Sequence, residues 1–316
     1  MQPTTRREFL VKSSAAGLSF LAVPSWLRAA DAPQPAGTPA GAGPLDMTIA
    51  RWAGGEVPAD LATRLTEQAV ATLGGMSRFV SRGSTVWVKP NIGWNRKPEF
   101  AANTHPDVVA AVVRMCFDAG AKSVKVGDFP CNEPKACYEN SGIAPAAKAV
   151  GADIVYLDQR RFRKMAIGGN RLKDHPVYPD IVECDLVINV PVCKHHGGSR
   201  VTLCMKNYMG VVDDRRTFHQ DLPTTIADIT QFMKPRLCIL DATRILTDHG
   251  PTGGKIEDVK TLNTVAAGVD IVALDAFGSE LLGKDPRQIE TVTKGAEYGL
   301  GRVDYRSLAL KELSLS

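Results

Sequence analysis

The amino-acid sequence predicts an α/β protein with a mainly parallel sheet and helices on both faces. Short β-branched runs alternate along the chain with amphipathic helical stretches, which is the order that builds βαβ units. Residues 184–191, CDLVINVP, are strongly apolar, as expected of a parallel strand that is buried on both faces. Polar residues follow several of these runs, at the sheet edge where open parallel sheets bind ligands.

The first elements follow from composition and local chemistry. Residues 47–52, MTIARW, predict a strand, and the amphipathic stretch 58–75 predicts a helix that glycines close. Residues 84–91, STVWVKPN, predict a second strand, which ends where Pro90 removes a backbone donor. The next helix, 104–121, is expected to begin at Thr104 as its N-cap and to stop at Gly120.

The remaining elements repeat this alternation. Each further strand is a short β-rich run, and the expected strands are residues 123–128, 153–158, 184–191 and 236–243. Helical patterns separate or follow them, and the expected helices are residues 141–152, 200–209 and 270–283.

The chain is expected to have three parts. Residues 1–32 predict a twin-arginine export signal, because Arg6 and Arg7 precede an apolar stretch that is too short to span a bilayer. Residues 33–45 are rich in Pro, Ala and Gly and predict a linker, and residues 46–316 predict the folded α/β domain. The expected location is therefore periplasmic or exported, with no stable membrane span after signal removal.

Composition and missing motifs exclude several classes of function. The net charge of +4 is scattered and aromatic residues are 6% of the chain, which argues against a nucleic-acid partner. The seven cysteines include no C-x-x-C pair, which argues against an iron–sulfur cluster held by this chain. The sequence also lacks G-x-S-x-G, Walker and G-x-G-x-x-G motifs. The expected partner is a small anionic molecule.

Polar side chains at the ends of the predicted strands describe the rim of a pocket. These side chains are Lys89, Asn91, Asp128, Lys194, His196 and Asp241. Strand-end Asp residues also serve as helix N-caps and turn formers, so Asp128 and Asp241 fit either reading. A turn requires neither lysine nor histidine, which favours the pocket for the other residues.

The segment 189–210 is expected to turn through two glycines into a helix. Ser199 is a suitable N-cap for a helix over 200–209, and Gly210 is a suitable terminator. A Gly-Gly-Ser turn at a helix N-terminus, flanked by Lys194 and Lys206, is a suitable cradle for phosphate or carboxylate. One stripe of this helix is expected to be core: Val201, Cys204, Met205, Tyr208 and Met209.

Two further readings of this region stay open. A metal site would have to be assembled from separate segments, because no zinc-binding spacing is present. Its candidate ligands are His196, His219 and His249. Cys193 beside Lys194 fits a reactive thiol, but the frequent burial of cysteine favours packing at the end of a strand.

The sequence resembles the domain-of-unknown-function family 362 (DUF362) over nearly all of the expected domain. The strongest matches are three motifs in order: K-P-N at 89–91, N-x-P-x-x-K-x-H at 189–196 and K-N-x-x-G at 206–210. The resemblance favours His196 over His195 as a site residue. It also implies redox chemistry, a metal or iron–sulfur cofactor, and a redox partner protein, although this chain carries no ferredoxin module.

These observations predict an enzyme that acts on a small anionic substrate, with oxidoreductase or metal-assisted chemistry as the implied reaction. The expected catalytic residues are His196, Lys194 and Lys206, with His196 as general acid/base near neutral pH. The expected substrate-binding residues are Lys89, Asn91, Asn207, Ser199, Asp128 and Asp241. A periplasmic protein that binds an anionic ligand without turnover is the alternative.

Overall fold

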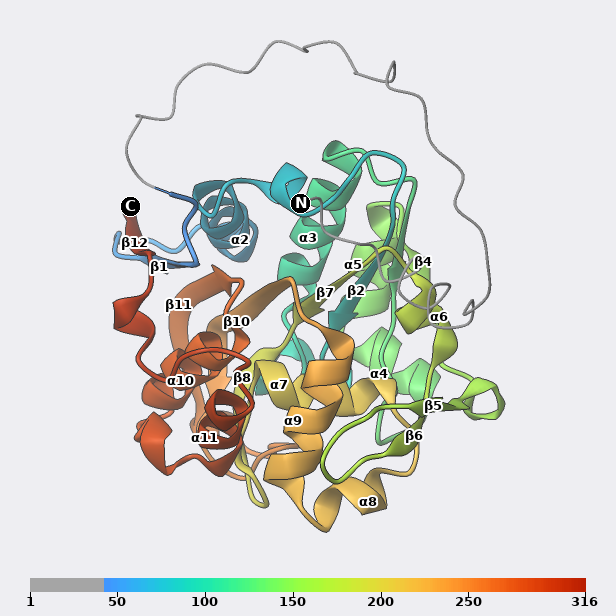
Figure 1. The fold of residues 1–316 in the computed structure, drawn as a ribbon. Coiled ribbons are helices and arrows are strands. Elements are labelled where there is room, and N and C mark those ends of the chain that lie inside the picture. The colour runs from blue at the N-terminus through green and yellow to red at the C-terminus, as the bar shows by residue number, and fades with distance from the viewer. Residues whose placement is uncertain (1–42) are drawn as a thin grey trace, which may run out of the picture.

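The computed structural model describes residues 43–316, so the expected export signal and most of the expected linker lie outside the described residues. A ten-stranded mixed sheet runs through the centre of the molecule, and helices cover both of its faces (Figure 1). Most neighbouring strands are parallel, and the strands around β11 and the β8–β9 hairpin are the antiparallel exceptions. The predicted α/β class is confirmed.

Eight strands form the continuous path of the sheet. Their order is β12 (Leu310–Leu315), β1 (Met47–Trp52), β11 (Val259–Gly268), β10 (Leu237–Leu246), β7 (Leu186–Val190), β2 (Thr85–Pro90), β3 (Ser123–Val126) and β4 (Asp153–Ile154). Two more strands lie off this path: β8 (Val192–His196) pairs with β10, and β9 (Arg200–Thr202) pairs with β8. A separate two-stranded sheet joins β5 (Arg163–Ala166) to β6 (Asp174–Val177).

Helices form a layer on each face of the sheet. One layer contains α2 (Leu61–Thr72), α3 (Pro106–Asp118) and α5 (Ile143–Ala149). The other contains α6 (Pro179–Glu183), α7 (Cys204–Asn207), α9 (Leu222–Met233), α10 (Ile271–Leu281) and α11 (Glu290–Glu297). Two short helices lie near the rim of the sheet, α4 (Pro134–Asn140) and α8 (Arg215–His219). The 3₁₀ turns are Met76–Arg78, Pro98–Phe100, Gln159–Arg161, Tyr208–Val211, Ile256–Asp258, Pro286–Gln288 and Tyr305–Ser307.

Successive side chains of the central strands point to opposite faces of the sheet and so form two hydrophobic cores. In β2, Val86 and Val88 pack into the core under α2 and α3, whereas Trp87 points into the opposite core. Strand β7 divides in the same way, since Val187 joins the core of Trp87 and Ile188 joins the other. Each side chain of this kind stabilises the fold by about 1.5–3 kcal/mol when it is fully buried. The central strands are therefore fixed in register, with their carboxyl ends at one edge.

Most predicted elements are confirmed, with two corrections near the N-terminus of α3 and in β4. Helix α3 begins after His105, whose Nδ1 accepts the backbone N–H of Asp107, and not after Thr104. The Thr104 hydroxyl instead donates to the carbonyl of Val190 at 2.7 Å. Strand β4 covers only two of the six residues expected.

The expected helix over 200–209 is wrong in its first half. Arg200–Thr202 is strand β9, which pairs antiparallel with β8, so Ser199 lies in a hairpin turn and caps no helix. Helix α7 starts only at Cys204, because the buried carboxylate of Asp275 accepts the backbone N–H groups of Cys204 and Met205 at 2.6 and 3.2 Å. The cap thus comes from a residue distant in sequence.

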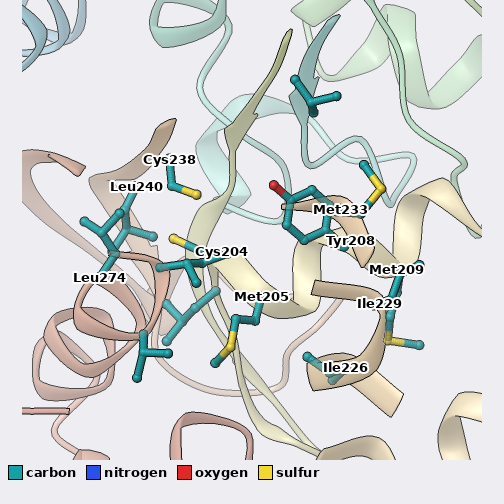
Figure 2. Close-up of a cluster of buried hydrophobic side chains, with 14 of the residues drawn as sticks. Cys204, Met205, Tyr208, Met209, Ile226, Ile229, Met233, Cys238, Leu240 and Leu274 are labelled. Atoms are coloured by element: carbon teal, nitrogen blue, oxygen red, sulfur yellow. The ribbon is translucent and has the colours of Figure 1, made fainter. Parts of the chain in front are cut away.

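The expected core stripe of this segment is nevertheless confirmed. Cys204, Met205, Tyr208 and Met209 are buried against α9 and β10 (Figure 2). Val201 joins the same core from strand β9. Burial was therefore predicted correctly where the local conformation was not.

Within residues 43–316, no helix combines the length and the apolar character that a membrane crossing requires.

Gly127→Ala is expected to destabilise the protein. A Cβ at this position would lie 2.7 Å from both the carbonyl oxygen of Val155 and the ring of Trp87. Overpacking of this kind costs about 1–3 kcal/mol. Urea denaturation measures the change in the free energy of unfolding. Gly55→Ala is the control, since its Cβ would meet nothing within 4 Å; equal stability of both variants would contradict the prediction.

Candidate functional site

A cavity of about 290 Å³ opens at the carboxyl ends of strands β2 and β3 and beside strand β8. Its polar lining includes Asn91, Asp128, Lys194, Lys206, Asn207 and Arg215. His196, His219 and Thr202 line it as well. Because parallel strands end at the same edge, residues far apart in sequence meet in one pocket. Most of the residues predicted for the site therefore come together.

A chain of hydrogen bonds and one ion pair lies behind the pocket lining. Lys89 is fully buried, and its Nζ donates to Asp128 Oδ1 at 2.7 Å and to Asn207 Oδ1 at 3.1 Å. Asn207 Nδ2 donates to Asn189 Oδ1 at 2.8 Å. Burial lowers the pKa of Lys89, and the Asp128 carboxylate opposes that shift. Lys89 thus supports the lining residues and does not itself line the cavity.

Lys89 and Lys194, at the two ends of this hydrogen-bonded network, fix the orientation of the side-chain amides between them. An ammonium group can only donate, so the atom of Asn207 that faces Lys89 must be its oxygen. That oxygen also accepts from Asn91 Nδ2 at 3.0 Å, which leaves Asn91 Oδ1 to accept from Lys194 Nζ at 3.0 Å. The network therefore runs without a break from Asp128 to Lys194.

Lys194 is a buried amine at the pocket wall. It is 1% exposed, and its Nζ donates to Asn91 Oδ1 and to the carbonyl of Ala102 at 2.5 Å. Burial, with smaller contributions from neighbouring cations, lowers the pKa of Lys194 to about 7. This side chain changes its charge close to neutral pH.

Lys206 is the second amine of the pocket. It is 9% exposed, and its Nζ donates to the thioether sulfur of Met209 at 3.1 Å, which is a weak acceptor. Burial and the nearby Arg215 lower the pKa of Lys206 to about 8. Among the described residues, the Lys206 ammonium therefore lacks the oxygen acceptors that usually accompany a buried lysine.

His196 does not have the protonation behaviour expected from the sequence. Burial, Lys206 and Lys194 together lower the pKa of His196 to about 3, so the imidazole is neutral near pH 7. Its Nδ1 accepts the backbone N–H groups of Gly198 and Ser199 at 2.9 and 3.1 Å. The ring proton must then lie on Nε2, which makes His196 a neutral hydrogen-bond donor. The general acid/base role near neutral pH is not supported for this residue.

Two lining residues of interest were not predicted from the sequence. Cys131 is exposed at the pocket, and Arg215 Nη1 donates to its sulfur at 3.0 Å. Thr202 is 5% exposed, and its hydroxyl has no hydrogen-bond partner among residues 43–316. The position of Cys131, three residues after the strand-end Asp128, was the available sequence signal.

Gly210 explains why the K-N-x-x-G motif ends in glycine. A Cβ at this position would overlap Asp128 Oδ1 and lie 2.7 Å from Lys89 Nζ. The backbone carbonyl of Gly210 accepts the N–H of Phe129 at 3.0 Å. Any side chain here would enter the buried ion pair.

Several predicted residues do not line the cavity. The carboxylate of Asp241 instead accepts hydrogen bonds from the backbone N–H of His105 and from the backbone N–H and hydroxyl of Thr243. Ser199 donates to Val201 O inside the hairpin turn. Cys193 is buried near the carbonyl of Gly278, which supports its reading as a packing residue.

The three proposed metal ligands are not grouped together. His196 and His219 line the pocket, whereas His249 lies in a separate exposed cluster with Asp248 and Asp258. His249 Nδ1 lies 2.8 Å from Asp258 Oδ2. Within the described part of the chain, this cluster is the one grouping of side chains that could hold a metal ion, and its residues do not line the cationic pocket.

Lys89→Met is expected to destabilise the protein by about 3–5 kcal/mol, the cost of leaving a buried carboxylate without its partner. Asp128 would keep its backbone donors but lose its cation. The free energy of unfolding in urea is the measurement. Arg160→Met is the control, because its ion pair with Asp158 is exposed to solvent and contributes little to stability. A loss as small as that of the control would refute the structural importance of the buried pair.

Comparison with known proteins gives one curated relative and one family. The chain is 29% identical over 238 residues to "Thylakoid-associated protein sll1697" of Synechocystis sp. (strain ATCC 27184 / PCC 6803 / Kazusa). The aligned region covers 72% of each of the two chains. The family profile described as "Domain of unknown function (DUF362)" matches residues 86–280. This range includes both ends of the buried network and most of the pocket lining. The chain therefore belongs to the DUF362 family.

Proposed function

We propose that this protein binds a small anionic substrate in the pocket and transforms it by proton transfer at Lys194. One observation carries the proposal: Lys194, Lys206 and Arg215 line the cavity, and none of them has a carboxylate within ion-pair distance among residues 43–316. The carboxylate of Asp128, which also lines it, is already paired with Lys89. The lining thus carries uncompensated positive charge.

An anion would relieve the cost of this charge. Removing an ammonium group from water costs several kcal/mol unless a counter-charge approaches it. The lowered pKa values of Lys194 and Lys206 express that cost, since both amines are driven toward their neutral forms. A carboxylate or phosphate in the cavity would bind the ammonium form of Lys206, whose pKa is the higher of the two, and would leave Lys194 divided between its two forms near neutral pH. The cavity size limits such a ligand to a small molecule.

The geometry of Lys194 suits a general base. A neutral amine has two N–H groups and one lone pair, and Asn91 Oδ1 and Ala102 O accept the two N–H groups. The lone pair is then free toward the cavity. Because its pKa is about 7, the neutral form is well populated at physiological pH. Lys194 therefore takes the proton-transfer role that the sequence suggested for His196.

The remaining groups suit binding of the anion. Lys206 supplies a positive charge up to a pH of about 8. His196 supplies a neutral N–H donor, and the unpartnered hydroxyl of Thr202 supplies another. An enzyme of this kind would show a bell-shaped pH profile, with activity rising through about 7 and falling through about 8. A protein that only binds would show a single monotonic fall in affinity.

The affinity for acetate or inorganic phosphate is expected to fall as the pH rises from 6 to 9. Lys194 and Lys206 are both charged below pH 7, and both lose their protons between about 7 and 9. A charge pair near a protein surface contributes about 1–4 kcal/mol, so the dissociation constant should rise about tenfold or more. Isothermal titration calorimetry measures it.

Two variants control this experiment. Lys206→Met should bind more weakly at pH 6 and show a shallower pH dependence, because a buried cation is lost. Lys135→Met removes an exposed lysine of helix α4 and should bind like the wild type. A dissociation constant that does not change with pH or with Lys206→Met would overturn the proposed anion site.

We also propose that the protein acts outside the cytoplasm or in association with a membrane. The twin-arginine pattern of residues 6–7 and the name of the thylakoid-associated relative support this location. Replacement of Arg6 and Arg7 by lysine should retain the full chain in the cytoplasm, because the export route recognises the arginine pair. Cell fractionation followed by immunoblotting measures the distribution. Unchanged fractionation of this double variant would contradict twin-arginine export.

A further inference from the structure

We propose that Cys131 is the nucleophile of this pocket and that its substrates are small carboxylates with an electrophilic carbon. The inference rests on the proposed anion site and deepens it, since it names the reacting atom and the substrate class. Four observations on the described residues carry it, and none depends on the sequence family.

Cys131 is set apart from the other cysteines by its exposure. All seven cysteines lie within the described residues; Cys131 is exposed and the other six are buried. Cys131 also lines the cavity that holds Lys194 and Lys206. A reagent or substrate that enters this cavity therefore meets one accessible thiol.

The cationic guanidinium of Arg215 lies against the sulfur of Cys131. Its Nη1 donates to Cys131 Sγ at 3.0 Å, and its other nitrogens donate to the backbone carbonyls of Phe129 and Met209. The guanidinium also lies 4.8 Å from the centre of the Phe129 ring. These contacts fix the guanidinium in place, so the sulfur has a permanent, oriented N–H donor. Reactive cysteines in proteins are found in such electropositive, accessible surroundings.

Both pocket lysines line the same cavity as the sulfur of Cys131. Cys131 raises the pKa of Lys194 and of Lys206, which opposes the lowering that burial causes. The thiol of Cys131 is thus close enough to interact electrostatically with the two amines that would hold the anion. A bound carboxylate would have its neighbouring carbon within the same cluster of groups.

Thr202 gives independent support for a ligand at this place. Thr202 is 5% exposed and lines the cavity, and its buried hydroxyl has no hydrogen-bond partner among residues 43–316. A buried hydroxyl without a partner costs about 1–3 kcal/mol. The cost is relieved when a bound molecule accepts its hydrogen bond, which is the behaviour of a binding group and not of a packing group.

The proposed step is a nucleophilic displacement. The neutral amine of Lys194 takes the proton of the Cys131 thiol as the sulfur forms a bond to the electrophilic carbon. The bond from that carbon to its leaving group breaks, the electron pair departs with the leaving group, and the ammonium that Lys194 has become returns the proton to it. Arg215 and Lys206 hold the carboxylate during the step. No external oxidant or reductant is consumed.

Alkylation with two probes of similar size tests the proposal. Iodoacetate and iodoacetamide each transfer a two-carbon group to sulfur with loss of iodide, but iodoacetate alone is an anion. Peptide mass spectrometry gives the rate for Cys131 with each. The ratio of the iodoacetate rate to the iodoacetamide rate should be about tenfold or more above the ratio for the urea-unfolded chain, since a cationic cleft raises the encounter rate of an anion.

The variants separate this proposal from the proposed function. Lys206→Met should lower the rate ratio toward that of the unfolded chain, whereas Lys135→Met should leave it unchanged. Cys131→Ser should still bind acetate in calorimetry. Equal rate ratios in the folded and unfolded chains, with acetate binding intact, would overturn the role of Cys131 and leave the anion site standing. Equal ratios together with no acetate binding would overturn both.

Discussion

A carboxylate within hydrogen-bond reach stabilises a lysine ammonium that is removed from water, and Asp128 supplies one to Lys89 across the ends of β2 and β3. Lys89 of this buried pair is hydrogen-bonded to Asn207. Asn207 is hydrogen-bonded to Asn91, and Asn91 to Lys194. Each side chain of the network is fixed by the one before it. The pocket wall is therefore rigid before any ligand arrives, and Gly210 is glycine because nothing larger leaves room for the pair.

The distribution of charge follows from this arrangement. The Asp128 carboxylate of the network forms its ion pair with Lys89. Lys194, Lys206 and Arg215 therefore remain without an anionic partner in the described structure. Such an imbalance is costly inside a protein, and sites that keep perturbed amines are frequently functional. Burial lowers the pKa of His196 and the neighbouring ammonium groups add to this shift, so the imidazole is neutral near pH 7. A Lys/Asn pocket with a neutral histidine is suited to hold an anion and to remove a proton from it.

Much of this could be predicted from the sequence where the signal was local. The alternation of strand and helix patterns predicted the α/β class, and the Lys and Asn residues at the strand ends predicted residues at the rim of the pocket. Long-range contacts escaped prediction. The start of helix α7 depends on Asp275, which lies about seventy residues further along the chain. Cys131 escaped because cysteines are usually buried, and its exposure depends on the loop that Arg215 holds.

The central claim is that Lys194 is a buried amine poised to receive an anion. NMR titration of isotope-labelled lysine side chains, with Lys194→Arg to assign the signal, measures its protonation directly. We expect a midpoint near pH 7 in the free protein and a higher midpoint when acetate is saturating. A midpoint above about 9, unchanged by acetate, would contradict it, since that is close to the value of an exposed lysine.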